Sequence, residues 1–319
     1  MSLPIALIRW KNYSETYNMH PRLANLLASH APGIHTDVPA ALYHAGPGVS
    51  RSHLAKLAES PFELHYSLTT PEADAPTEAQ KLGTMLDFFI ERGSTESLPV
   101  GYVAIPDVHL GSKEGRKHKE AWPDSTLVKT PAVDTTVSCY DAIMKHRRIA
   151  RMIAESQRQL SVYSDFQVIW DCPMFHVDEQ AVCEKVPVNL TRRCRPDLVP
   201  PPDWLADGYT FMVDIKTTRC DLSDKRNWWR ECWEFGYFMQ AGWYLNTCRA
   251  AGLDRTLFTH LVVETHPPFR VRMFYLPPEE VEAAYQRCLE LLAQLVACVK
   301  ADSWPDTSDI ILPLKTNLP

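Results

Sequence analysis

The stretch that decides the fold is Phe211-Met212-Val213-Asp214-Ile215-Lys216, an apolar β-strand pattern that carries two charges. Successive side chains of a strand point to opposite faces, so Asp214 and Lys216 share one face while Val213 and Ile215 face the core. A buried carboxylate or ammonium is costly unless another group compensates its charge. The stretch therefore predicts a polar site that contains a further charged group, a metal ion, or both.

The second carboxylate of this site is predicted to be Asp197, in the sequence Pro196-Asp197 that precedes the strand. Two carboxylates can hold a hard divalent cation, which neutralises the negative charge that develops when a phosphodiester is hydrolysed. A nearby lysine stabilises the same charge or orients the attacking water. The alternative is a surface strand with an Asp–Lys pair, which an Asp-x-Lys sequence alone does not exclude.

Together, Pro196-Asp197 and Asp214-Ile215-Lys216 resemble the PD-(D/E)xK motif of the restriction-endonuclease-like nuclease superfamily. The resemblance implies that Asp197, Asp214 and the Ile215 carbonyl hold Mg²⁺ or Mn²⁺ and that Lys216 is catalytic. It also implies an α/β fold with a restriction-endonuclease-like central mixed sheet, flanked by helices, and an N-terminal helical wall. The central sheet is expected to carry Asp165, Asp197 and Asp214.

Two helical segments near the N-terminus narrow this resemblance. The segment Ser50–Ala58 ends before Ser60-Pro61, and the helix expected over 78–91 contains Leu-Gly-Thr at 82–84. These features look like the start of the RecE-like (exonuclease VIII type) domain of phages and prophages, a branch of the RecB-type nucleases. That family carries Gly-x-x-x-His, whereas this chain has Gly83 and Asp87.

Asp87 is therefore predicted to approach the metal ion in place of the family's histidine, since a carboxylate is a harder ligand than imidazole. Two alternatives stay open at this position. The substitution could mark a weakened or altered enzyme, and Asp87 could be an ordinary exposed residue of an amphipathic helix.

Two further positions match the family. Gln240 and Tyr244 stand four residues apart in the helix expected over 228–249, so they lie on one helix face. They resemble the QxxxY motif, which implies that they support the active site and contact the DNA backbone. Asp165, in the strand expected over 161–170, takes roughly the place of a family glutamate and is assigned a supporting metal role. The alternative for Asp165 is an exposed strand acid.

The formal net charge of -6 means that the whole protein repels DNA, so any DNA-binding surface must be local. Arg193, Arg195 and Arg219 lie close in sequence to the acid pair and are the candidate DNA-binding residues, with Gln240 and Tyr244. Other basic clusters occur at 113–119 and 145–151. Each of these clusters could equally be a solvated face.

The 319 residues, 45% of them hydrophobic, can bury one large core with an appended part. We expect an N-terminal arm at 1–40 and a nuclease domain at 41–319, with a helical part at 49–158 and the catalytic sheet and helices at 161–305. Nine cysteines without a CxxC pair argue against a zinc or iron–sulfur cluster. No membrane-length run or signal-peptide pattern is found, so a cytoplasmic protein without membrane contact is expected.

The resemblance implies a Mg²⁺-dependent (or Mn²⁺-dependent) exodeoxyribonuclease that degrades linear double-stranded DNA from 5′ to 3′ in recombination. It further implies a single-strand annealing protein as partner and a homo-oligomeric ring around the DNA. One alternative is an endonuclease or another nucleic-acid hydrolase of the same fold. The other is a catalytically weakened nuclease-fold protein that has a DNA-binding or regulatory role.

Overall fold

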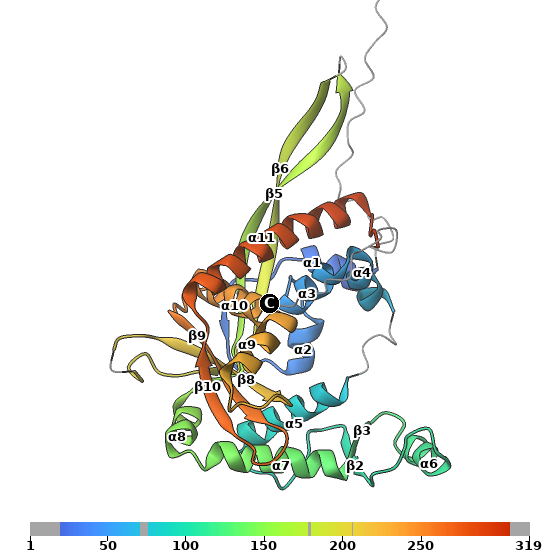
Figure 1. Ribbon diagram of the computed structural model, residues 1–319. Helices are drawn as coiled ribbons and strands as arrows, with labels where there is room; N and C mark the ends of the chain where they lie inside the picture. The colour runs from blue at the N-terminus through green and yellow to red at the C-terminus, as the bar shows by residue number, and fades with distance from the viewer. Residues whose placement is uncertain (1–19, 71–75, 178–179, 206, 307–319) are drawn as a thin grey trace, which may run out of the picture.

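A computed structural model describes residues 20–70, 76–177, 180–205 and 207–306 (Figure 1). Within 171–184 it describes the backbone alone. Residues 1–19 of the predicted arm and 307–319 of the predicted nuclease domain lie outside the described residues. The described part of the arm contains α1 (Pro21–Leu27) and β1 (Gly33–His35). Leu23 and Leu26 of α1 are buried in the main core, so this segment packs into the domain.

A five-stranded mixed sheet forms the centre of the molecule. Its strand order is β10-β9-β8-β7-β4. β8 and β9 run parallel, and the other neighbouring pairs run antiparallel. The strands are β4 (Gln157–Arg158), β7 (Leu198–Val199), β8 (Phe211–Thr218), β9 (Leu257–Glu264) and β10 (Val271–Tyr275). The predicted α/β architecture with a central mixed sheet is confirmed.

Helices cover both faces of this sheet (Figure 1). On one face, Met212, Phe258 and Val262 pack in the main core; on the other face, Val213 and Leu261 pack in a second core. This alternation follows from the two-residue period of strands. The first face is covered by α9 (Lys225–Glu234) and α10 (Tyr237–Ala250), and α3 (Arg51–Glu59) and α11 (Pro278–Ala301) pack against α10. The second face is covered by α5 (Glu78–Arg92), α7 (Thr130–Met144) and α8 (Arg147–Glu155).

A separate three-stranded sheet consists of β1, β5 (Ser161–Val177) and β6 (Gln180–Cys194). The β5–β6 hairpin extends far beyond the helices, as Figure 1 shows. Asp165 lies on β5, opposite Thr191 of β6. The prediction that Asp165 belongs to the central sheet is therefore wrong, because the strand expected over 161–170 pairs with the hairpin partner and not with β8.

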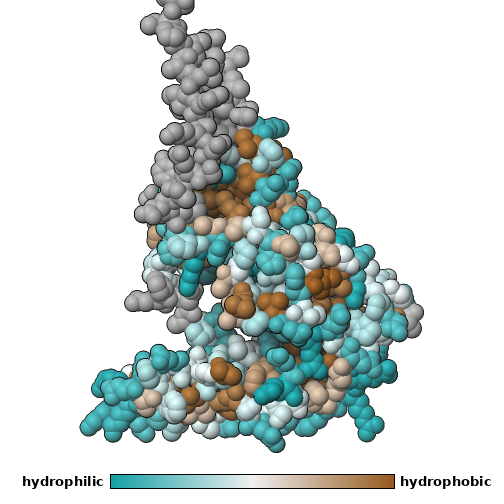
Figure 2. Space-filling view, turned by 180° about the vertical axis from the view of Figure 1, so that it is seen from behind, coloured by the Kyte–Doolittle hydropathy of each residue, from teal (hydrophilic) through white to brown (hydrophobic). Residues whose placement is uncertain are grey.

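The N-terminal helices and a small lobe complete the structure. α2 (Ala40–Ala45), α3 and α4 (Pro61–Thr69) follow one another along the chain. The lobe contains β2 (Tyr102–Ile105), which pairs in parallel with β3 (Thr126–Lys129), and α6 (Lys113–Ala121) between them. Figure 2 shows that the largely hydrophilic lobe stands off from the body and leaves a hollow in this side of the surface.

Two helices expected to be continuous are each divided. The helix expected over 135–158 ends at Met144, and α8 begins at Arg147 after the extended residue His146. The helix expected over 228–249 is divided between α9 and α10 at Gly236, whose φ of 63° is a left-handed conformation that glycine adopts without strain. Within the described ranges, each helix is too short or too polar to cross a membrane.

Helices α10 and α11 pack closely where they cross at Gly242. A Cβ at Gly242 would lie 2.8 Å from the Val281 carbonyl oxygen and 2.9 Å from Tyr285 Cβ, whereas a Cβ at Gly83 of α5 would have no atom within 4 Å. Gly242→Ala is expected to lower the free energy of unfolding by about 1–3 kcal/mol through overpacking. Gly83→Ala is expected to raise it by about 0.5–1 kcal/mol, because alanine favours helices. Urea unfolding of both variants measures the difference, and equal effects would contradict it.

Candidate active site

Asp214 lies on β8 under α10, and it is 3% exposed. Gln240 Nε2 of α10 donates a hydrogen bond to Asp214 Oδ1 at 2.5 Å, and Lys216 Nζ forms an ion pair with Asp214 Oδ2. The strand alternation predicted from the sequence therefore places Asp214 and Lys216 side by side. Gln240, predicted from its helix spacing, joins them directly.

Asp197 reaches the same site from the segment that leads into β7. The main-chain N–H of Ile215 donates to Asp197 Oδ2 at 2.7 Å. Since Ile215 stands between Asp214 and Lys216, this bond holds the second carboxylate beside the first. Asp197 and Asp214 are thus brought together as the sequence predicted.

Gln159 is a site residue that the sequence did not reveal. Its Nε2 donates to Asp197 Oδ1 at 3.0 Å, and its main-chain N–H donates to the Asp197 carbonyl at 3.0 Å. Arg195 Nε donates to Gln159 Oε1 at 2.8 Å. Gln159 has a left-handed backbone, with φ of 48°. A lone glutamine after a two-residue strand gives no sequence signal, so this positioning role emerges only from the fold.

The carboxylates repel one another. Burial and the nearby Asp214 raise the pKa of Asp197 to about 7, although Lys216 and the hydrogen bonds from Ile215 and Gln159 oppose the rise. Burial, followed by Asp197 and Asp214, raises the pKa of Asp87 on α5 well above its ordinary range. Asp87 is therefore near enough to the acid pair to be affected by its charge, whereas its approach to a metal ion stays a prediction.

Lys216 is held as a cation. Burial lowers the pKa of its ammonium, but Asp214, with Tyr237 and Asp197, raises it above the ordinary value. The ammonium also lies 4.9 Å from the centre of the Tyr237 ring, a cation–π distance. One ammonium thus faces Asp87, Asp197 and Asp214, and the site keeps an excess of acidic groups.

Tyr244 lies one turn beyond Gln240 on α10, and its ring meets Phe258 of β9 edge to face, with the centroids 5.8 Å apart. Burial, then the nearby Tyr43, Asp214, Cys194 and Asp197, raise the pKa of the Tyr244 phenol well above its usual value. The phenol therefore stays neutral and can donate a hydrogen bond near the acid pair.

The remaining predicted residues occupy other positions. Asp165 is exposed on the β5–β6 hairpin. Arg193 is 3% exposed and donates to the main-chain carbonyls of Tyr43, His44 and Gly46, so it caps the C-terminal end of α2. Its predicted contact with DNA conflicts with this burial, which leaves the guanidinium no access to a phosphate.

Arg195 and Arg219 differ in whether their guanidinium groups are free to reach a DNA phosphate. Besides bonding Gln159, Arg195 donates to the Val38 carbonyl and Ser161 Oγ, so its guanidinium is engaged by groups of the protein itself. Arg219 follows β8 directly and is exposed. Of the three arginines, Arg219 has the placement that a DNA contact needs.

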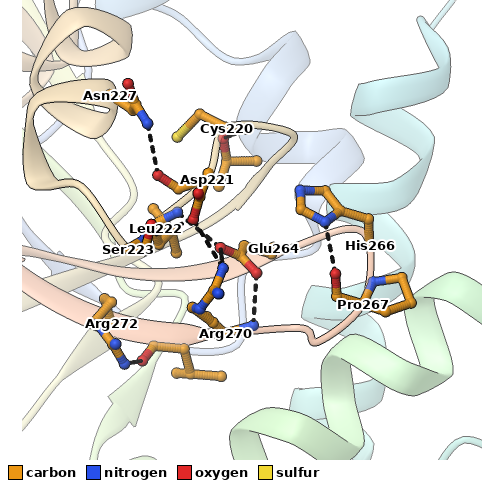
Figure 3. Close-up of polar contacts among 12 residues, drawn as sticks. Cys220, Asp221, Leu222, Ser223, Asn227, Glu264, His266, Pro267, Arg270 and Arg272 are labelled. Carbon is orange, nitrogen blue, oxygen red and sulfur yellow. Dashed lines mark hydrogen bonds and ion pairs between the residues drawn. The ribbon is translucent and has the colours of Figure 1, made fainter.

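A polar network around the buried Glu264 fixes the loop that follows β8 (Figure 3). Glu264, fully buried at the end of β9, accepts hydrogen bonds from the Leu222 N–H at 2.8 Å and the Arg270 N–H at 3.1 Å. The Arg270 guanidinium contacts Glu264 at 3.1 Å and Asp221 at 2.8 Å. Thr218 Oγ1 donates to Glu231 of α9 at 2.8 Å. These contacts anchor the end of the strand that carries the acid and the lysine.

The donor set suits a hard divalent cation. Asp214 Oδ2 is buried, and its partner among the described residues is the Lys216 ammonium. No three His, Cys, Asp or Glu side chains of the described ranges converge into a metal site. A cation would therefore bind through Asp197, Asp214, the Ile215 carbonyl and water. Mg²⁺ is commonly held in this way, by one or two carboxylates and retained waters.

Known proteins resemble this chain in part of its sequence and in its fold. Residues 180–315, which include Asp197, Asp214 and Lys216, match the family described as a PDDEXK-like domain of unknown function. A crystal structure of a "putative exonuclease" from Eubacterium rectale superposes with a TM-score of 0.50 at 13% identity, covering 85% of this chain and 90% of that one. No curated protein matches the sequence. The chain therefore has the restriction-endonuclease-like fold, and its acid pair and lysine lie within the segment that matches a PDDEXK-like domain.

Proposed function

We propose that the protein is a metal-dependent deoxyribonuclease, a phosphodiester hydrolase. The observation that carries the proposal is the hydrogen bond from the Ile215 N–H to Asp197, because it sets two carboxylates side by side next to Lys216. The match of residues 180–315 to a PDDEXK-like domain supports the same conclusion.

Each residue of the site has a distinct part in this proposal. Asp197, Asp214 and the Ile215 carbonyl hold Mg²⁺ or Mn²⁺, which supplies positive charge to the phosphate and lowers the pKa of bound water. Asp87 adds a further carboxylate near the cation. Lys216 places its ammonium toward the scissile phosphate and orients the water. Gln159 and Gln240 fix the two aspartates by hydrogen bonds.

The substrate proposed is linear double-stranded DNA, degraded from 5′ to 3′ in recombination. The exonuclease part rests on the motifs shared with RecE-like domains and on the name given to the Eubacterium rectale protein, "putative exonuclease". Tyr244 and the exposed Arg219 are the proposed contacts to the DNA backbone. A homo-oligomeric ring, a single-strand annealing partner and a cytoplasmic location complete the proposal by the same resemblance.

The acid pair and the lysine should be indispensable. Asp214→Asn and Lys216→Ala are each expected to lower kcat on linear duplex DNA with Mg²⁺ by on the order of 10²-fold or more, because each removes charge stabilisation at the phosphate. Asp165→Ala, a carboxylate on the separate hairpin sheet, is the matched control and should retain the wild-type rate. Loss of activity in Asp165→Ala together with full activity in Lys216→Ala would overturn the assignment.

Whether the enzyme cleaves DNA from an end or internally is tested with the same sequence as a linear duplex and as a covalently closed circle. A linear duplex should be degraded with Mg²⁺, whereas a covalently closed circle should stay intact, because an exonuclease needs an end. End-labelled duplexes read by gel electrophoresis give the direction, with the 5′ label expected to be released first. Cleavage of the closed circle would identify an endonuclease. DNA retention without hydrolysis, with either Mg²⁺ or Mn²⁺, would identify a binding protein.

Cation binding should depend on pH through Asp197. Its pKa is raised to about 7 in the folded chain, so its contribution to the stability of the metal-free protein is present below about pH 4 and lost as the pH rises through 7. A cation displaces the proton and offsets this loss. The rise in Tm on adding Mg²⁺ is therefore expected to be larger at about pH 8 than at about pH 6.

Thermal unfolding with Mg²⁺ and with a chelator, at both pH values, measures this difference. Asp197→Asn should remove most of the Mg²⁺ effect, since the amide carries no charge. An equal Mg²⁺ effect at both pH values, unchanged in Asp197→Asn, would show that the cation binds elsewhere.

A further inference from the structure

β10 forms one edge of the five-stranded sheet, and among the described residues it pairs with β9 alone. At the two ends of this ladder, the Glu264 N–H donates to the Arg270 carbonyl and the Leu276 N–H donates to the Phe258 carbonyl, each at 3.0 Å. Hydrogen-bonded pairs alternate along an antiparallel ladder. The even-numbered residues of β10 therefore bond β9, and the main-chain groups of residues 271, 273 and 275 point away from the sheet.

This edge is only partly protected against the addition of a strand. Arg272 Nη1 donates to the Val271 carbonyl at 3.1 Å, a contact drawn in Figure 3, and this satisfies one outward group. The outward groups of Met273 and Tyr275 have no partner strand in the part of the chain that is described. Their side chains are 38% and 66% exposed. Native edges are commonly protected by short strands, charged side chains, proline or a covering element. β10 is five residues long and carries one charge, that of Arg272, but contains no proline.

Each face of the edge has a pocket. On the α8 side, a pocket of about 290 Å³ is lined by Trp204, Leu257 and the side chains of Met273 and Tyr275. On the α9 side, a pocket of about 370 Å³ is lined by Trp229, Phe274 and Pro277 among others. The side chains of a strand alternate between faces. A strand added to β10 would therefore direct successive side chains into the two pockets in turn.

The rim of the edge is positively charged. Arg148 lines the first pocket, Lys225 lines the second, and Arg272 is exposed on β10 itself. Arg226 also lines the second pocket, but it is paired with Asp224 and adds no net charge. An occupant that carries acidic groups around an apolar centre would match this distribution.

We propose that β10 is a docking edge for an extended, acidic-flanked apolar segment of a partner protein, which binds as an added antiparallel or parallel strand. Main-chain hydrogen bonds to Met273 and Tyr275 would provide affinity, and the two pockets would select the alternating side chains. The proposal is independent of the nuclease activity, because it rests on the register of β10, its pockets and its charge.

The charge also decides between possible occupants. A second copy of this chain would bring the same basic rim to the edge, and the like charges would repel each other. Nucleic acid would match the charge, but its sugar-phosphate backbone lacks the amide ladder that β10 offers. An acidic extended peptide satisfies the charge, the main-chain groups and the pockets together.

The test uses a fluorescein-labelled peptide, Asp-Glu-Val-Leu-Val-Leu-Val-Glu-Asp, and fluorescence anisotropy with the full chain. Binding is expected, and N-methylation of alternate peptide amides should weaken it by about tenfold or more, since it removes hydrogen bonds and keeps the side chains. Met273→Pro should weaken binding to a similar degree, because it removes an outward N–H without breaking a bond to β9. Its Tm is measured to show that the variant folds.

Should Met273→Pro unfold the chain, Met273→Glu is the second variant, because a charge on the edge opposes strand addition and a negative one also repels the acidic flanks of the peptide. Absence of peptide binding, or binding that neither N-methylation nor the Met273 variants weaken, would overturn the proposal. So would light scattering that shows a wild-type dimer lost in Met273→Glu, which would assign the edge to a second copy. Displacement of the peptide by a single-stranded oligonucleotide whose own binding Met273→Glu abolishes would assign the edge to nucleic acid.

Discussion

Repulsion among Asp87, Asp197 and Asp214 is the constraint around which the centre of this structure is built. Among the described residues, the Lys216 ammonium is the cation that offsets these acids, and burial together with the neighbouring carboxylates still raises the pKa values of Asp87 and Asp197. Buried like charges are unfavourable unless a cation or a proton relieves them. The apolar cores on both sides of the sheet supply the stability that holds the acids together, and the stored repulsion favours a divalent cation.

The break between α9 and α10 sets the geometry above the acids. Gly236 adopts a left-handed conformation, and α10 begins directly after it. This start places Tyr237 over Lys216 and Gln240 over Asp214, with Tyr244 one turn further along the same face. Arg51 of α3 donates to the Phe235 carbonyl just before the break, so the N-terminal helices also hold this turn. A short helix–helix junction thereby aligns three side chains of the site.

The sequence predicted the parts of the site that follow a periodic rule. Asp214 and Lys216 share a face because strands alternate, and Gln240 and Tyr244 share a face because helices repeat about every four residues. Asp165 was misplaced because strand alternation gives the face of a residue but not the partner of its strand. Arg193 and Gln159 could not be assigned from sequence either, since capping α2 and orienting Asp197 are contacts between segments far apart in the chain.

The position of β10 relative to β8 shows how the docking edge and the acid pair can coexist. β9 lies between them, with His260 opposite both Asp214 on one side and Phe274 on the other. Neighbouring strands lie about 4.8 Å apart, so an added strand would stand about 14 Å from β8. His260 is fully buried among Trp228, Tyr237 and Phe258, and this aromatic layer separates the second pocket from Lys216. A partner bound at the edge would therefore sit close to the site while leaving its carboxylates uncovered, and the rigid sheet would fix the distance between the two.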